Sequence, residues 1–266
     1  MARARLAVAL GAGAARGLAH IGVLQVFEET GIEADYVAGT SIGALVGALY
    51  AAGVDLRELE KVASNLRLKH LADFVLPGRG GLIGGDKLRG LLNLFLRGKT
   101  FDDLRIPLAV VATDLKTGQE VVFREGKLVE AILASCAIPG VFVPVTYRDR
   151  LLADGGLVDR VPVRVARSMG PAVVVAVDVG ANLSKSRLRT LPEITMQAID
   201  IMQEEIMRLK AREADVFIRP DVGHFNPFRL DRGQELVRRG REAALVALPQ
   251  ILASLKRRKP VKMTRN

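Results

Sequence analysis

Residues 39–43 read Gly-Thr-Ser-Ile-Gly and match Gly-x-Ser-x-Gly, a pattern typical of a nucleophilic serine on a strand-to-helix turn. Such a turn leaves little room two residues before and after the serine, which suits Gly39 and Gly43. The small-residue run 44–48 predicts a helix whose first N–H groups face charge developing on a substrate. Ser41 is therefore a candidate nucleophile. Its alternative role is a helix N-cap, which serine commonly fills.

The glycine-rich loop 11–17 is a candidate oxyanion hole, because small residues let a substrate approach backbone N–H groups closely. Two other functions of glycine loops fit less well. A dinucleotide fingerprint would place its third glycine at position 16 rather than at Gly17, and would end the second strand with an acid. A phosphate-binding P-loop would end in Gly-Lys-Ser/Thr, which this loop lacks.

Four residues are candidates for the base that a serine nucleophile needs. His20 follows the glycine loop on a predicted helix, His70 lies among basic and apolar residues, and His224 lies in a predicted loop. Asp154 begins an Asp-Gly-Gly sequence at the end of a predicted strand, close to the backbone and open to a site. The same three residues are also a common turn signal.

Apolar runs and turn residues predict strands that alternate with helices along the chain. Predicted strands cover residues 5–10, 35–39, 106–113, 120–124, 141–147, 151–152, 173–177 and 216–218. One predicted helix follows the glycine loop and ends near residue 29. Other predicted helices cover residues 42–52, 55–75, 87–97, 127–136, 192–213 and 232–255. This alternation predicts an α/β fold, a three-layer α/β/α sandwich with a largely parallel central sheet. Residues 1–255 form a single predicted domain, and residues 256–266 form a basic C-terminal tail.

The composition fits this architecture, since 49% of the 266 residues are hydrophobic, only 5% are aromatic and Trp is absent. Small aliphatic residues suit helices that lie close on a parallel sheet. A lone Cys136 excludes an internal disulfide, and its apolar neighbours predict a buried, inert thiol. The basic and then apolar residues 1–10 could begin a signal peptide, but a buried strand leading into the glycine loop is the favoured interpretation.

The net charge is +10, and six basic residues lie between positions 256 and 265. The simplest interpretation is a solvated tail; the alternatives are contact with anionic phospholipid headgroups or with nucleic acid. No nucleic-acid-binding motif accompanies the charge, so no specific nucleic-acid partner is expected. No apolar run is long enough for a transmembrane helix. The expected location is cytoplasmic, with peripheral membrane contact through the tail as an alternative.

Taken together, loop 11–17, the motif 39–43 and Asp154 to Gly156 resemble, in this order, the motifs of the patatin-like phospholipase family. Residues 134–144 also resemble the block that precedes the acid in bacterial members. The resemblance covers roughly residues 5–220. It implies a patatin-like fold and a Ser-Asp dyad without a catalytic histidine. In this dyad Ser41 attacks the acyl carbonyl and Asp154 acts as general base.

The resemblance also implies an oxyanion hole in the loop that contains Gly11, Gly13, Ala14 and Arg16. N–H groups around Gly13 and Ala14 would donate, and Arg16 would brace the loop or meet a phosphate. Many members have an unbroken glycine run where this chain has Ala12 and Ala14. Alanine keeps the N–H donor but resists positive φ.

The expected function is hydrolysis of lipid acyl esters, of phospholipase A, lysophospholipase or carboxylesterase type, with a lipid substrate and no cofactor or metal. One alternative is an α/β-hydrolase esterase with a Ser41-Asp154-His224 triad, since the chain order fits. Another is a lipid-sensing regulatory scaffold with little turnover. The glycine-rich segment 77–85 is a candidate lid over the acyl site.

Overall fold

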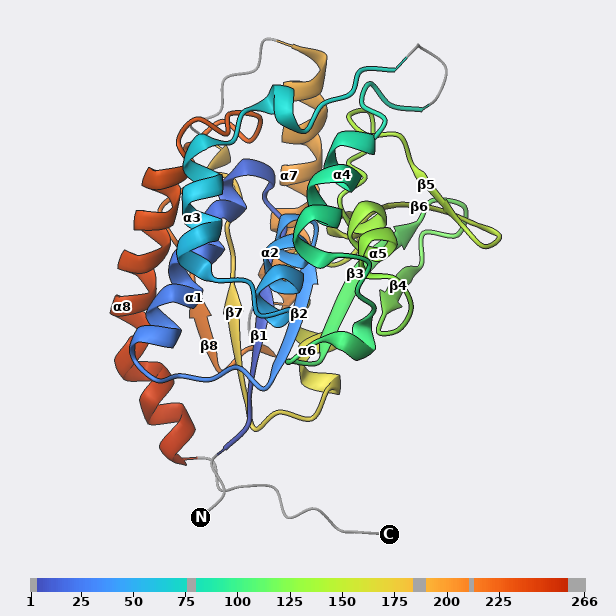
Figure 1. Cartoon of the computed structure of the whole chain (residues 1–266). Helices are drawn as coiled ribbons and strands as arrows, with labels where there is room; N and C mark the ends of the chain where they lie inside the picture. The colour runs from blue at the N-terminus through green and yellow to red at the C-terminus, as the bar shows by residue number, and fades with distance from the viewer. Residues whose placement is uncertain (1–3, 76–79, 184–189, 211–212, 258–266) are drawn as a thin grey trace, which may run out of the picture.

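The computed structural model describes residues 4–75, 80–183, 190–210 and 213–257, which form a twisted eight-stranded sheet between two helical layers (Figure 1). The strand order is β5-β6-β3-β2-β1-β7-β8, and β4 pairs with β3 off this path. The strands are β1 (Leu6–Leu10), β2 (Tyr36–Thr40), β3 (Leu108–Asp114), β4 (Glu120–Phe123), β5 (Val145–Tyr147), β6 (Arg150–Asp154), β7 (Val173–Val177) and β8 (Val216–Ile218). The five strands β3, β2, β1, β7 and β8 run parallel, while β4 and β6 pair antiparallel with β3. The predicted fold class is confirmed.

Alternation along the central strand explains the layers. In β1, Leu6, Val8 and Leu10 join the larger core cluster, whereas Ala7 and Ala9 join a second cluster on the opposite face. Successive side chains of a strand point to opposite faces, so a strand buried on both sides is continuously apolar. β1 is therefore an interior strand, as the favoured interpretation of residues 5–10 predicted.

More helices cover one face of the sheet than the other. The helices are α1 (Ala19–Glu29), α2 (Ile42–Ala51), α3 (Leu56–Asn65), α4 (Asp86–Leu96), α5 (Leu128–Ser135), α6 (Val163–Ser168), α7 (Leu191–Lys210) and α8 (Gly233–Arg257). Residues of α1 to α5 and of α8 share the larger cluster, while residues of α6 and α7 share the second. The short α6 was not predicted, because six residues are too few to display a helical period.

Two predicted elements differ from the structure around residues 66–85. The helix predicted over 55–75 is shorter in the structure and consists only of α3. It ends at Asn65 because the backbone is extended at Leu66, with ψ of 137°. The strand predicted over 141–147 is only β5, because the Val141 carbonyl accepts hydrogen bonds from the Leu82 and Ile83 amides instead. The apolar residues of both segments predicted burial. They did not predict that residues 82 and 83 would pair with Val141, which lies far away in the sequence.

Helix α8 packs on α1 through close backbone contact. A Cβ atom at Gly240 would lie 1.9 Å from the Ala19 carbonyl oxygen, and one at Gly22 would lie 2.0 Å from that of Val237. The described part of α8 ends at Arg257, at the lower end of the molecule in Figure 1. Residues 258–266, which include most of the predicted basic tail, lie outside the described residues. Among the described helices, none combines the length and apolar character needed to cross a membrane.

Candidate functional site

Ser41 lies on the turn between β2 and α2, with φ of 55° in the left-handed region. A Cβ atom at Gly43 would lie 2.1 Å from the Leu10 carbonyl oxygen, and one at Gly39 would lie 2.5 Å from the Ala44 Cα. Both positions therefore require glycine, as the pattern predicted. Ser41 occupies the N-cap position of α2, but its side chain makes no capping hydrogen bond to the helix.

The elbow is fixed from behind by a buried serine of α5. The Ser41 amide donates to the Ser135 Oγ at 2.7 Å, and the Ser135 hydroxyl donates to the Val111 carbonyl at 2.6 Å. Ser135 is fully buried. The bonds tie β2, α5 and β3 together at Ser41, so the strained turn is over-determined by its surroundings.

Asp154 ends β6 and meets Ser41 directly. Its carboxylate accepts a hydrogen bond from the Gly156 amide at 2.8 Å and lines a small cavity together with Ser41. Burial raises the pKa of Asp154 to about 6, against the lowering effects of the nearby Ser41 hydroxyl and of the Gly156 amide. A Cβ atom at Gly155 would lie 2.2 Å from the Val111 carbonyl oxygen. The Asp-Gly-Gly sequence is thus a tight turn that also delivers a carboxylate to the serine.

The glycine loop follows β1 and continues into a 3₁₀ turn, η1 (Ala14–Leu18). Four of its amides already donate to backbone carbonyls of the described chain: those of Gly11, Ala12, Ala15 and Arg16, to Val177, Arg160, Pro227 and Gly13. The amides of Gly13 and Ala14 take no part in these bonds. Ala14 adopts φ of 48° despite its Cβ. The alanine-containing loop therefore reaches the conformation that glycine would favour.

Arg16 is 1% exposed and forms an ion pair with Asp200 of α7 at 3.1 Å. Its Nε also donates to the Gly13 carbonyl at 3.2 Å. Of the two roles predicted for Arg16, these contacts are those of a brace, because a guanidinium this deeply buried and paired is not presented to a phosphate.

The three histidines are engaged away from Ser41. The Nε2 of the fully buried His20 donates to the Gly11 carbonyl at 2.8 Å, and burial lowers the pKa of this imidazole to about 4. The His70 Nδ1 accepts from the Arg67 amide at the surface. His224 lies 3.6 Å from Asp221 and lines a polar pocket to which Ser41 does not contribute.

Two cavities meet at Ser41. The larger, of about 430 Å³, is almost entirely apolar, within the range of small-molecule sites. Its walls come from α2, α3, α4, the residues Leu71, Phe74, Leu82 and Ile83, and the loop 226–230. Representative wall residues are Leu45, Val62, Leu91, Leu92, Phe95 and Phe228. The smaller, of about 20 Å³, is lined by Asp154, Gly13 and Ala14, among others. An apolar chamber and a polar niche thus share one serine.

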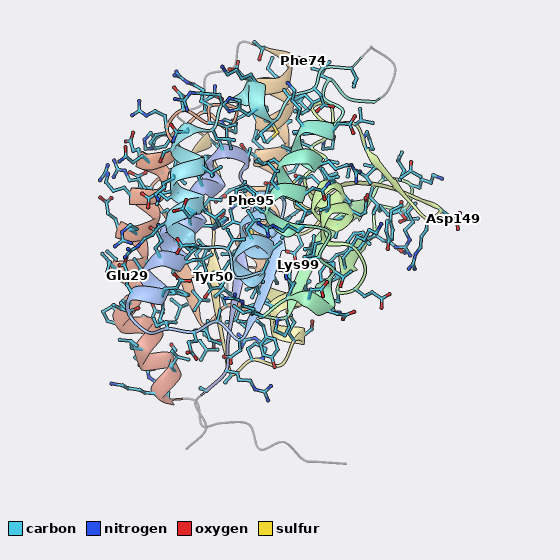
Figure 2. All side chains as sticks on the ribbon, in the orientation of Figure 1. Glu29, Tyr50, Phe74, Phe95, Lys99 and Asp149 are labelled. Carbon is cyan, nitrogen blue, oxygen red and sulfur yellow. The ribbon has the colours of Figure 1, made fainter. Side chains whose placement is uncertain are left out.

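The rim of the larger cavity at Phe74 and the described end of α8, from which the predicted basic tail continues, lie at opposite ends of the molecule (Figure 1 and Figure 2). Phe74 lines the cavity yet is 78% exposed, and it lies at the upper end of the molecule in Figure 2. Of the segment 77–85, residues 77–79 lie outside the described residues. In the remainder, Leu82 and Ile83 line the cavity.

Cys136 also lines the larger cavity beside Ser41. Burial raises the pKa of the Cys136 thiol far above its usual range, and the neighbouring Asp154 carboxylate adds to this shift. An un-ionised thiol is a poor nucleophile, which agrees with the inert cysteine expected from the sequence.

Sequence reasoning missed the contribution of α7. Asp200 and Gln203 line the smaller cavity and are 5% and 7% exposed. The available signal was their spacing from Met196 and Ile199, which places all four on one buried helical face. That spacing indicates burial, but it does not indicate that the two polar side chains belong to a site.

Comparison with known proteins gives this geometry a family. The model of the patatin-like phospholipase family matches residues 8–167, which is more than half of the chain and includes the loop, the elbow and Asp154. The chain belongs to the patatin-like phospholipase family. Membership supports lipid hydrolase activity. In the described residues of this patatin-like chain, no group of three or more His, Cys, Asp or Glu side chains could hold a metal ion.

Relatives of this patatin-like chain include the uncharacterized NTE family protein Rv1063c of Mycobacterium tuberculosis, 36% identical over 200 residues, which cover 74% of this chain and 55% of that protein. Patatin-like phospholipase domain-containing protein 6 of Homo sapiens is 36% identical over 185 residues, or 66% of this chain and 13% of that protein. The chain thus spans about half of the first relative and a small part of the second.

Solved structures share the fold. VipD from Legionella pneumophila has a TM-score of 0.65 at 15% sequence identity, and the match covers 93% of this chain and 67% of that one. The type III effector protein ExoU has a TM-score of 0.53 at 18% identity, with 94% and 53% covered. At these identities the likeness concerns the fold alone.

Proposed function

We propose that this chain hydrolyses lipid acyl esters through an acyl-enzyme on Ser41, with Asp154 as general base. The observation that carries the proposal is that Ser41 and Asp154 line the same small cavity, where the apolar cavity meets the glycine loop, and that the Ser41 hydroxyl lies close enough to lower the pKa of the Asp154 carboxyl. A serine needs such a base to become nucleophilic at neutral pH. A carboxylate with a pKa of about 6 is ionised at pH 7 and still basic enough to take the proton.

The reaction has two halves. Ser41 Oγ bonds to the acyl carbonyl carbon as its proton passes to Asp154, and the alcohol departs with that proton. Asp154 then takes a proton from the water that attacks the acyl-enzyme, and returns this proton to Ser41 Oγ as the ester bond breaks and the fatty acid leaves. In both halves the Gly13 and Ala14 amides stabilise the oxyanion, since they are not used within the loop. Gly11 and Arg16 hold the loop in place through bonds to Val177 and Gly13.

The apolar cavity indicates the substrate class. Its walls offer aliphatic and aromatic side chains such as Leu92 and Phe95 and little polar surface. An acyl chain buried there gains about 0.8 kcal/mol for each methylene removed from water. We propose a lipid ester with a long acyl chain; the apolar contacts do not depend on the headgroup.

The alternative triad has less support. His224 lies beside Asp221 and contributes to neither cavity that Ser41 lines. Asp154 shares the smaller cavity with Ser41, and no histidine of the described residues lines that cavity. The scaffold alternative predicts that Ser41 is unreactive. Labelling of Ser41 by a serine-directed probe therefore distinguishes a scaffold from a hydrolase.

A fluorophosphonate probe distinguishes these possibilities. The folded protein is expected to form one adduct, located by mass spectrometry on the peptide that contains Ser41. Ser41→Ala should abolish the adduct, whereas Ser64→Ala, at a serine of α3, should leave it unchanged. A long-chain ester added in excess should slow labelling. A folded protein without a Ser41 adduct would contradict the proposed function.

A further inference from the structure

Helix α7 reaches the glycine loop through one buried ion pair. The Arg16 Nη2 donates to both carboxylate oxygens of Asp200, at 3.3 and 3.1 Å. The two side chains are 1% and 6% exposed. A buried guanidinium without its carboxylate would be strongly unfavourable, so Asp200 fixes where the Arg16 side chain can lie.

Arg16 in turn fixes one peptide group of the loop. Its Nε and its backbone N–H both donate to the Gly13 carbonyl, each at 3.2 Å. The Gly13 carbonyl and the Ala14 N–H belong to the same planar trans peptide, so they point in opposite directions. With the carbonyl held at Arg16, the Ala14 N–H is directed away from Arg16. Ala14 itself lines both cavities that contain Ser41.

The conformation held in this way is one that alanine resists. Ala14 has φ of 48°, where its Cβ is crowded. Each of the two donors on the Gly13 carbonyl opposes the rotation of the peptide that would relieve this crowding, so loss of the Nε donor alone makes this rotation easier. The brace therefore has a definite task, which is to keep the Ala14 N–H in its strained orientation.

We propose that Asp200 is a positioning residue of the oxyanion hole, acting through Arg16 on the Gly13–Ala14 peptide. The inference rests on the proposed function. Asp200 therefore contributes to stabilising the transition state, in which negative charge develops on the acyl oxygen. It contributes much less to binding of the acyl chain. The pairing joins residues 184 positions apart, in α7 and η1.

The test compares an oxyanion mimic with a ligand that uses only the apolar cavity. For Asp200→Ala we expect kcat on a p-nitrophenyl acyl ester to fall about 100-fold, as when an oxyanion donor is lost, with KM changed less than about threefold. Affinity for a trifluoromethyl ketone with the same acyl chain should fall by the same factor. Affinity for the matching fatty acid should stay unchanged.

Two further variants keep the proposal testable if Asp200→Ala folds poorly. Arg16→Lys retains a cation for Asp200 but removes the Nε donor to Gly13, so it should lower kcat and ketone affinity together, at least about tenfold. Asp215→Ala removes the partly buried partner of Arg167 and serves as the stability control. It should lower the unfolding temperature and leave the ratio of ketone to fatty-acid affinity unchanged.

Three results would overturn the proposal. If wild type hydrolyses the ester in a Ser41-dependent way and Asp200→Ala and Arg16→Lys retain kcat, the positioning role fails alone. Equal loss of ketone and fatty-acid affinity in these variants would likewise reduce Asp200 to a stabilising residue. If wild type shows no Ser41-dependent hydrolysis, the proposed function and the positioning role both fail.

Discussion

The two sides of Ser41 are built by different means. On one side, the elbow and the glycine loop are held by backbone contacts so close that Gly39 and Gly43 have no room for a Cβ. On the other side, the apolar cavity is made by side chains from α2, α3, α4 and two loops. The first side is rigid and depends on particular residue types; the second depends on volume and hydrophobicity. We therefore expect sharp losses from changes on the first side and graded ones on the second.

The largest expected loss is at Asp154. Asp154→Asn removes the proposed base and should lower kcat about 10³-fold, within the range of general-base contributions. Asn is close in shape and its Oδ1 can still accept from Ser41 and Gly156. Initial rates on a soluble acyl ester measure the effect, and full activity of the variant would eliminate the dyad.

Stability provides the control for that variant. The pKa of Asp154 in the fold, about 6, lies above the ordinary 3.8, so its stabilising contribution is complete below pH 3.8 and is lost as pH rises through 6. At pH 8 the charged carboxylate costs folding up to about 3 kcal/mol, and a neutral Asn avoids this cost. Asp154→Asn should therefore unfold at the same temperature as wild type or a higher one at pH 8. A lower unfolding temperature would assign its lost activity to misfolding.

The pH profile of wild type tests the same carboxylate without a mutation. Because Asp154 must be ionised to accept a proton, kcat/KM on an uncharged ester should rise with pH and level off above about 6. At pH 5 it should be about tenfold below the plateau. Circular dichroism over pH 4.5 to 8 confirms that the protein stays folded. A plateau that continues down to pH 5 would contradict the raised pKa.

The contrast between the two sides also explains what the sequence could predict. Strands β7 and β8 were predicted with the bounds observed, because runs such as Val173–Val177 are apolar throughout, as doubly buried strands are. The elbow was predictable because steric limits allow one residue type at Gly39 and Gly43. Such constraints are local, and a local pattern records them.

Other parts of the site depend on contacts between distant residues. The spacing of Asp200 from Met196 and Ile199 places it on the buried face of α7, but nothing near it in the sequence indicates that its carboxylate pairs with Arg16. The helix predicted to continue past Leu66 ended there, and Leu82 and Ile83 instead pair with the segment at Val141. Which segment supplies the partner is decided by tertiary packing. The walls of the cavity were unpredictable for the same reason.

A bulkier residue in the cavity should change chain-length preference. Leu91 of α4 lines the cavity, and Leu91→Trp should exclude about two methylenes of a long acyl chain. At about 0.8 kcal/mol each, this lowers kcat/KM for a dodecanoyl ester about 15-fold relative to a butanoyl ester. Leu94→Trp is the matched control, because Leu94 is on the same helix but 72% exposed. Equal effects of the two variants would argue against an acyl site between α3 and α4.

The smallest expected effects are at the two alanines of the glycine loop, and they differ in sign. Ala14 adopts positive φ, so Ala14→Gly relieves backbone strain of about 1–2 kcal/mol in the folded state. The glycine also increases the conformational entropy of the unfolded chain, which costs about 0.4–1 kcal/mol of stability. A net gain in unfolding free energy of about 0.5–1 kcal/mol follows. Ala12 has no positive φ, so Ala12→Gly relieves no strain and has the entropic loss together with the loss of a buried methyl group. Both variants keep the N–H groups, and kcat should stay within about threefold. Urea unfolding of the pair measures the difference; destabilisation by Ala14→Gly would show that the loop is held in its shape without strain at Ala14.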